Sequence, residues 1–141
     1  MSEERAIVDT DVFVSARNRN ESGSSSCRAF LDRFDQGDLQ SLASTITIAE
    51  LRAGLSAAEA QSTWQAFVSH LLASPNFRVE PVDVAIAEGA GELRQRTNLS
   101  LPDALIVTTG KLRGAAYIVS QDLDLNRKQT LLEVRAPNTA A

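Results

Sequence analysis

The sequence is poor in the residues that form disulfide scaffolds and soft-metal sites. Its 141 residues include one cysteine, Cys27, and one histidine, His70. A single thiol forms no internal disulfide, and a lone histidine without a partner at ligand spacing indicates no zinc site. We therefore expect neither a disulfide framework nor a zinc centre, and we assign His70 no catalytic role.

Long apolar runs and an excess of positive charge are also missing. No run approaches the ~20 apolar residues of a membrane helix, and residues 1–5 show no signal-peptide pattern. We therefore expect a cytoplasmic protein with no membrane partner. The formal net charge of −4 argues against broad, sequence-blind binding to nucleic acid, but it does not exclude a local surface that a metal ion assists.

Short apolar segments typical of buried strands alternate with segments of helical periodicity. Strands are expected at residues 6–8, 42–46, 77–82 and 117–120, with a last edge strand within 131–134. Helices are expected at residues 27 to about 37, from 48 onward, 56–74, 84–97 and 101–113. This alternation predicts an α/β fold, a three-layer α/β/α sandwich with a mainly parallel central sheet. We expect one domain over residues 1–141, frayed at about 1–5 and 137–141.

Hydroxyl residues stand where two of these helices begin. Residues 15–26 lack apolar periodicity and predict a loop, and one of the three serines at 24–26 is expected to cap the following helix. Thr47 with Glu50 three residues later predicts a capping box. Glu50 therefore has a structural explanation beside any functional one.

Four acids recur where the expected elements end or begin. Asp9 and Asp122 follow strands, Glu50 lies early in a helix, and Asp103 lies in the first turn of another. Each acid alone is explained as a cap or turn residue. Together they lie where parallel strands end and the next helices begin, which is the usual place of a functional crevice.

Convergence of these acids requires a cation, because like charges at close range disfavour ionisation. Oxygen ligands alone favour a hard ion, Mg²⁺ or Mn²⁺. Such a site suits hydrolysis of phosphodiesters, because the metal binds a phosphoryl oxygen and lowers the pKa of bound water. Thr10 and Ser120 lie beside the acids and are expected to bond ligands or metal-bound water.

Four short motifs together resemble the PIN-domain ribonucleases. They are Ile7-Val8-Asp9-Thr10-Asp11-Val12-Phe13, Thr47-Ile48-Ala49-Glu50-Leu51, Leu101-Pro102-Asp103-Ala104-Leu105-Ile106 and Ile118-Val119-Ser120-Gln121-Asp122. No single motif is specific, but the four occur in order over nearly the whole chain. More narrowly, the chain is similar to VapC-like toxins of bacterial type II toxin–antitoxin systems.

This resemblance implies a Mg²⁺-dependent endoribonuclease that cuts tRNA or other structured RNA. It also implies a homodimer and a VapB-like antitoxin whose carboxyl-terminal segment lies across the active-site groove. The family's four acids correspond to Asp9, Glu50, Asp103 and Asp122, of which the three aspartates are the expected metal ligands, and its small hydroxyl residue to Ser120.

The chain departs from the family pattern at three places. Asp11 stands where the family commonly has Asn or Ser, Gln121 replaces a residue that is often Arg or Asn, and Asp124-Leu125 replaces a frequent Asp-Phe. We take Asp122 as the last acid, with Thr10, Asp11, Ser120 and Asp124 as auxiliary residues.

Two other functions compete with the nuclease. Asp9-Thr10-Asp11 resembles the motif of haloacid-dehalogenase-type phosphatases, in which the first Asp is the nucleophile; that family also needs a suitably placed Lys, and Lys111 is expected at the far end of a helix. The second alternative is a catalytically silent PIN-like binding subunit, which the complete set of acids argues against. RNA contact would require cations near the acids, for which the candidates are Arg17, Arg19, Arg52, Arg94, Arg96 and Arg127.

Overall fold

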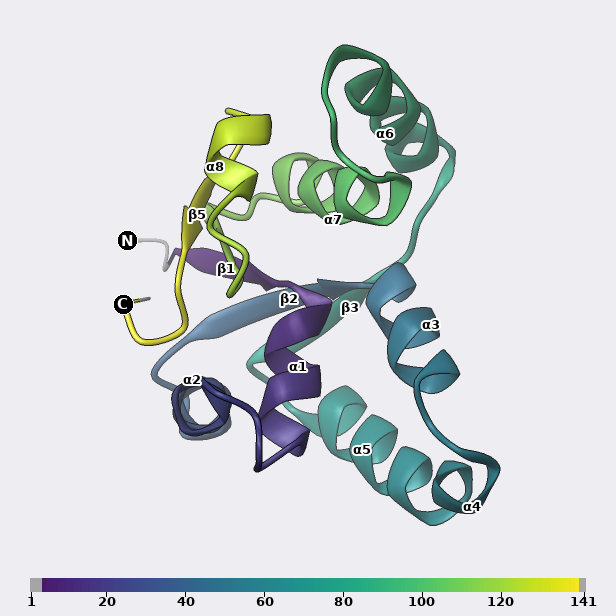
Figure 1. Ribbon diagram of the computed structural model, residues 1–141, viewed down its shortest axis with the longest axis vertical. Helices are drawn as coiled ribbons and strands as arrows, with labels where there is room; N and C mark the ends of the chain where they lie inside the picture. Colours follow the sequence, from purple (N-terminus) through teal and green to yellow (C-terminus); the bar gives the residue numbers. More distant parts are fainter. Residues whose placement is uncertain (1–3, 140–141) are drawn as a thin grey trace.

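The computed structural model describes residues 4–139 as a central sheet with helices on both faces (Figure 1). The strands are β1 (Arg5–Val8), β2 (Gln40–Ser44), β3 (Phe77–Glu80), β4 (Tyr117–Val119) and β5 (Glu133–Arg135). The helices are α1 (Thr10–Arg17), α2 (Ser24–Asp35), α3 (Thr45–Ala53), α4 (Ala57–Ala60), α5 (Ser62–Ala73), α6 (Val84–Arg96), α7 (Leu101–Leu112) and α8 (Leu125–Lys128). Within this part of the chain, no helix is both long and apolar enough to span a membrane.

The sheet is parallel throughout, in the order β3-β2-β1-β4-β5. The central strand β1 pairs Ile7 with Leu42 of β2 on one side and with Ile118 of β4 on the other. Parallel strands require helical crossovers, which cover both faces of the sheet and bury the strands. The prediction of an α/β/α sandwich with a mainly parallel sheet is confirmed.

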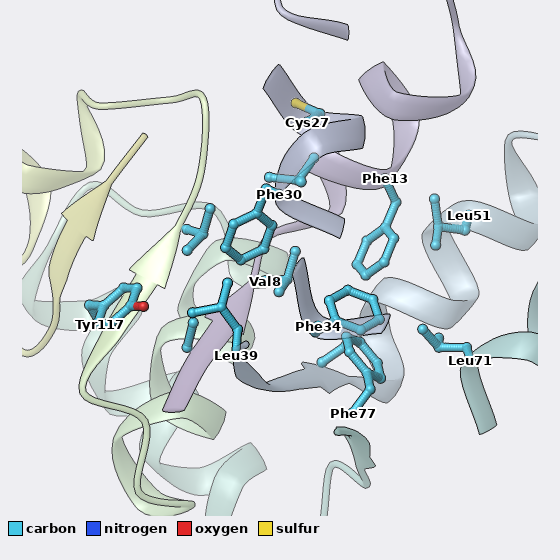
Figure 2. Close-up of a cluster of buried hydrophobic side chains, with 14 residues drawn as sticks. Val8, Phe13, Cys27, Phe30, Phe34, Leu39, Leu51, Leu71, Phe77 and Tyr117 are labelled. Carbon is cyan, nitrogen blue, oxygen red and sulfur yellow. The ribbon is translucent and has the colours of Figure 1, made fainter. Parts of the chain in front are cut away.

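Two apolar cores lie on opposite faces of the sheet. Successive side chains of a strand point to opposite faces, so Ala6 and Val8 enter one core and Ile7 the other. The first core packs α1, α2 and α5 against the sheet and contains Phe13, Phe34 and Phe77 (Figure 2). The second core packs α6, α7 and α8 against the other face (Figure 1).

The chain turns directly from β1 into a helix that the sequence analysis missed. Helix α1 begins at Thr10, so Ser15 lies inside a helix, and the predicted loop is confined to residues 18–23. The prediction of a serine cap on α2 is also wrong, because Gly23 occupies that position with φ 85° and no side-chain cap bond. Val12 and Phe13 are buried against the sheet, and this packing outweighs their modest helix propensity.

Helix α3 begins three residues earlier than predicted. Strand β2 ends at Ser44, whose hydroxyl accepts a 3.1 Å hydrogen bond from Ile46 N and caps the helix. The predicted capping box of Thr47 and Glu50 is therefore not formed. Thr47 is fully buried one turn before Glu50, whose carboxylate extends to another partner.

The remaining elements follow the predictions with local differences. The predicted helix over residues 56–74 is two helices, α4 and α5, and the capping box forms at Ser56 and Glu59. Helix α6 is capped by the Asp83 side chain, which accepts from Ile86 N, and α7 by the Ser100 side chain, which accepts from Asp103 N. Helix α8 was not predicted. Of the residues expected to fray, 1–3 and 140–141 lie outside the described residues, whereas Arg5 belongs to β1 and Pro137 is buried.

Candidate active site

The carboxyl ends of the neighbouring strands β1 and β4 bring Asp9 and Ser120 together. Val8 pairs with Val119 in the parallel register, and Asp9 N donates a 2.9 Å hydrogen bond to Val119 O. The next residue on each strand therefore leaves the sheet at the same point. The Ser120 hydroxyl donates a 2.7 Å hydrogen bond to Asp9 Oδ2.

Asp9 is a buried carboxylate without a cationic partner. Its side chain is 7% exposed and caps α1, because Oδ1 accepts a 2.8 Å hydrogen bond from Thr10 N. The pKa of Asp9 is raised from 3.8 to about 7, chiefly by burial and also by the charges of Asp11 and Asp103, against the opposing effect of the hydrogen bonds from Ser120 and Thr10. Among residues 4–139, no Lys or Arg forms an ion pair with Asp9.

Asp11 binds the backbone that follows β4. Its carboxylate accepts hydrogen bonds from Gln121 N at 3.2 and 3.3 Å, and Ser120 Oγ lies 3.3 Å from its Oδ2. Burial and the charge of Asp122 raise the pKa of Asp11, and the hydrogen bonds from Gln121 and Ser120 lower it. Asp11 thus positions the turn that carries Asp122 while adding negative charge beside Asp9.

Glu50 is joined to the first strand's end through Thr10. The Thr10 hydroxyl donates a 2.7 Å hydrogen bond to Glu50 Oε1 and lies 2.9 Å from Thr47 Oγ1. Glu50 is exposed, whereas Thr47 is fully buried. The Thr10 hydroxyl, which lies beside the buried Thr47 hydroxyl, therefore holds one oxygen of an otherwise solvated carboxylate.

The two remaining acids reach this cluster from separate elements. Asp103 lies half-buried in the first turn of α7, and its charge raises the pKa of Asp9. Asp122 N donates a 3.0 Å hydrogen bond to Ser120 Oγ. The Asp122 carboxylate is exposed, and its negative charge raises the pKa of Asp11. The structure thus brings Asp9, Asp11 and Asp122 around Ser120, with Asp103 linked to Asp9 by charge rather than by contact.

Asp124 has a different environment from the other acids. Its carboxylate forms an ion pair with Arg127 and lies 4.0 Å from Lys128 Nζ. Its amide donates a 3.1 Å hydrogen bond to Asp122 Oδ1. Asp124 is therefore neutralised by the cations of α8, and only its backbone supports the acidic cluster.

The carboxylate oxygens of these acids are the type of ligand that a hard divalent cation prefers. Within the described part of the chain, no three His, Cys, Asp or Glu side chains are arranged closely enough to hold a metal ion. However, a buried carboxylate that other acids surround and no cation balances is costly to ionise. Carboxylate oxygens are the ligands that Mg²⁺ and Mn²⁺ prefer, so a divalent ion would relieve this cost.

Two residues that support the site were missed in the sequence. Thr47 was assigned as a cap, although its position three residues before Glu50 places both side chains on one helix face. Gln121 stands between Ser120 and Asp122, and its side chain donates a 2.6 Å hydrogen bond to Ser15 Oγ. The signals in the sequence were the helical spacing of Thr47 from Glu50 and the adjacency of Gln121 to Asp122.

The family model of the PIN domain matches residues 6–131. The chain belongs to the PIN-domain family. PIN domains are typically nucleases and generally use a divalent metal ion. No curated protein matches the chain.

Solved structures similar to this PIN domain are toxin–antitoxin complexes. A complex from Klebsiella pneumoniae is 21% identical with a TM-score of 0.69, over 94% of this chain and 97% of that one. VapBC2 from Rickettsia felis, bound to promoter DNA, is 18% identical with a TM-score of 0.68, over 94% and 98%. DNA-bound VapBC from Salmonella typhimurium is 17% identical with a TM-score of 0.68, over 96% and 99%. At these identities the likeness shows the fold, which is that of VapC-like PIN toxins.

Proposed function

We propose that this PIN domain is a metal-dependent endoribonuclease, the toxin of a VapBC-like toxin–antitoxin system acting in the cytoplasm. The observation that carries the proposal is the buried Asp9 carboxylate, which lies among acids and has no cationic partner in the described residues. Such an arrangement fits a bound divalent ion and, through it, a phosphodiester substrate. RNA, either tRNA or another structured RNA, is the substrate class we propose.

Asp9, Asp103 and Asp122 would hold the Mg²⁺ ion, with Mn²⁺ as a substitute. A bound divalent ion supplies a polarised phosphoryl oxygen and a water of lowered pKa. The chain's own contribution is to orient the ligands: Ser120 fixes one oxygen of Asp9, and Asp11 fixes the turn before Asp122.

Glu50 is proposed to move the proton of the attacking water. The Thr10 hydroxyl occupies its Oε1, which leaves Oε2 to accept a proton from water on the solvent side. We exclude Asp124 from this set, because its carboxylate pairs with Arg127 and Lys128.

The antitoxin and the homodimer are also proposals for this chain. The antitoxin is supported by the similar proteins that were crystallised as toxin–antitoxin complexes. It is supported further by an apolar cavity of about 270 Å³ between α1, α2, α3 and α5, lined by Phe13, Leu51, Trp64 and Phe67 among others. Apolar side chains of an antitoxin helix would fit this cavity, and a basic segment of the same protein would complement the acidic site.

The test is metal-dependent cleavage of RNA by the purified chain. We expect cleavage with Mg²⁺ or Mn²⁺, none with EDTA, and a loss of at least a hundredfold in Asp9→Asn with the fold intact. Asp35→Asn is the matched control: it makes the same chemical change on α2, where Asp35 is hydrogen-bonded to His70. Undiminished cleavage by Asp9→Asn would contradict the assignment.

The alternatives give different results in the same experiment. A phosphatase of the haloacid-dehalogenase type would hydrolyse a small monoester through a covalent intermediate on Asp9; membership of the PIN-domain family argues against it, as does Lys111 in the last turn of α7. A silent binding subunit would cleave nothing and would show no rise in melting temperature with Mg²⁺.

A further inference from the structure

A basic cleft lies between the end of α6 and helix α8, outside the acidic site. It is an open cleft of about 360 Å³, lined by Gln95, Arg96, Thr97, Asn98, Arg127 and Lys128. Both segments lie on the face of the sheet that α7 covers (Figure 1). All six side chains are polar, and three of them are cationic.

The cleft is positively charged in a chain that carries a net charge of −4. The carboxylate paired with its cations is that of Asp124, which meets Arg127 and Lys128. Three cations and one paired carboxylate leave a local charge of +3 − 1 = +2. This concentration of one sign is not a consequence of composition.

Arg96 distinguishes the cleft from an ordinary helix end. Cations in the last turn of a helix are favoured by its dipole, and Arg94 serves that structural purpose by donating a 2.6 Å hydrogen bond to Leu99 O. Arg96 lies in the same turn and is exposed. Among residues 4–139 its guanidinium has neither an ion pair nor a hydrogen bond.

The two segments that form the cleft continue into the acidic site. Thr97 and Asn98 precede Ser100, which caps the helix that carries Asp103. Arg127 and Lys128 follow the turn in which Asp124 N bonds to Asp122 Oδ1. Both segments of the cleft are therefore joined along the chain to the acidic site, one through Ser100 to Asp103 and the other through Asp124 to Asp122.

We propose that this basic cleft binds a phosphate group of the RNA strand next to the one that is cleaved, with Arg96 as its main contact. The proposal rests on the proposed nuclease function. The acids at the cleavage site repel a polyanion, so attraction must come from cations close by. The planar guanidinium of arginine can donate two parallel hydrogen bonds to phosphate oxygens. Neutral donors such as Thr97 and Asn98 add further hydrogen bonds to the same phosphate.

The test measures RNA binding without cleavage. In the Asp9→Asn background and in EDTA, Arg96→Glu and Lys111→Glu are compared by fluorescence anisotropy with a labelled single-stranded RNA. Both substitutions change the net charge equally, but Lys111 is exposed in the last turn of α7, away from Asp103. We expect Arg96→Glu to weaken binding about tenfold and Lys111→Glu to change it less than twofold.

The salt dependence gives a second measurement. Loss of one phosphate contact reduces the slope of log K against log salt by roughly 0.7 on a single strand. Arg96→Gln, which removes the charge from an exposed position, is expected to show this change with an unaltered melting temperature. If the Arg96 variants and their parent bind RNA with equal affinity and with equal salt dependence, the proposal that the cleft binds an RNA phosphate is wrong.

Cleavage assays separate this inference from the function on which it rests. With Asp9 intact, we expect Arg96→Gln to raise KM several-fold and to leave kcat unchanged. If Arg96→Gln cleaves RNA with an unchanged KM, the cleft does not bind the RNA strand, whereas the nuclease function remains supported. RNA binding that depends on Arg96 in a protein that cuts no RNA would overturn the nuclease function and support the cleft.

Discussion

The Ser120 hydroxyl donates a 2.7 Å hydrogen bond to Oδ2 of the buried Asp9 carboxylate. Ser120 is fully buried and has one hydroxyl proton, and its more distant acceptor is Asp11 Oδ2 at 3.3 Å. It also accepts a hydrogen bond from Asp122 N. One side chain therefore sets the positions of three acids, although its single proton only partly offsets the cost of burying Asp9.

The first prediction is that Asp9→Asn stabilises the metal-free protein at neutral pH. Because the pKa of Asp9 rises from 3.8 to about 7, the folded protein holds a proton that the unfolded chain releases between these values. The free energy of unfolding therefore falls as pH rises through this window. A rise of about three pKa units corresponds to about 4 kcal/mol as an upper bound.

Asparagine at position 9 does not ionise, so it avoids the free-energy cost of a buried negative charge, and it retains the local geometry. Its oxygen accepts from Thr10 N, and its amide donates to Ser120 Oγ. Urea unfolding in EDTA should show Asp9→Asn to be more stable than the parent at pH 8, with the difference vanishing near pH 4. A parent as stable as Asp9→Asn at pH 8 would refute the electrostatic account.

The second prediction concerns the two neighbours that act on Asp9 in opposite directions. Removing the charge of Asp11 in Asp11→Asn should lower the pKa of Asp9, whereas removing the hydrogen bond in Ser120→Ala should raise it. An NMR titration of the Asp9 carboxyl carbon in metal-free protein measures both shifts against a parent midpoint near 7. Shifts of the same sign in the two variants would contradict the assignment of causes.

The meeting of Asp9 and Ser120 was predictable because it depends on strand register. Buried strands are recognised by their apolar residues, and parallel neighbours end at one edge of the sheet. Val8 pairs with Val119, so the next residues are neighbours. The roles assigned to the four acids remain proposals, because register brings backbones together without specifying which carboxylates share a ligand.

Helix α1 and the start of α3 were not predictable in the same way. Val12, Phe13 and Val14 are weak helix formers, and the burial of Val12 and Phe13 against the sheet decides the conformation. Strand β2 pairs with β3 only as far as Ser44, because its partner there is Glu80, the last residue of β3; no local pattern contains this limit. That pairing makes Ser44 the cap and leaves Glu50 free to bind Thr10.

The third prediction is that Thr10→Val impairs catalysis without unfolding the protein. Valine has the shape of threonine but lacks the hydroxyl that donates to Glu50. A hydrogen bond to a charged group contributes ~1.5 to 3 kcal/mol, so kcat should fall roughly tenfold or more. Thr10→Ser keeps the donor and should stay within threefold of the parent. Equal kcat in Thr10→Val and Thr10→Ser would show that the hydroxyl does not position Glu50.

The fourth prediction is that Gly23 and Gln121 are energetically coupled. Gly23 has φ +85°, and a Cβ added to it would lie 2.4 Å from Gln121 Oε1. Gly114 has the same φ with no neighbour within 4 Å of such a Cβ. Gly114→Ala should therefore cost only the left-handed backbone strain, about 1 kcal/mol. Gly23→Ala should cost about 1 kcal/mol more, because it displaces Gln121 from its hydrogen bond to Ser15.

A double-mutant cycle isolates the part of the Gly23→Ala destabilisation that comes from displacing Gln121. In the Gln121→Ala background the Cβ of residue 23 meets no amide, so Gly23→Ala should cost no more than Gly114→Ala. Urea unfolding of the four proteins of the cycle gives the coupling free energy, expected near 1 kcal/mol. A coupling of zero would mean that Gln121 moves aside without loss, and that its bonds to Ser15 and Asp11 do not hold the turn before Asp122.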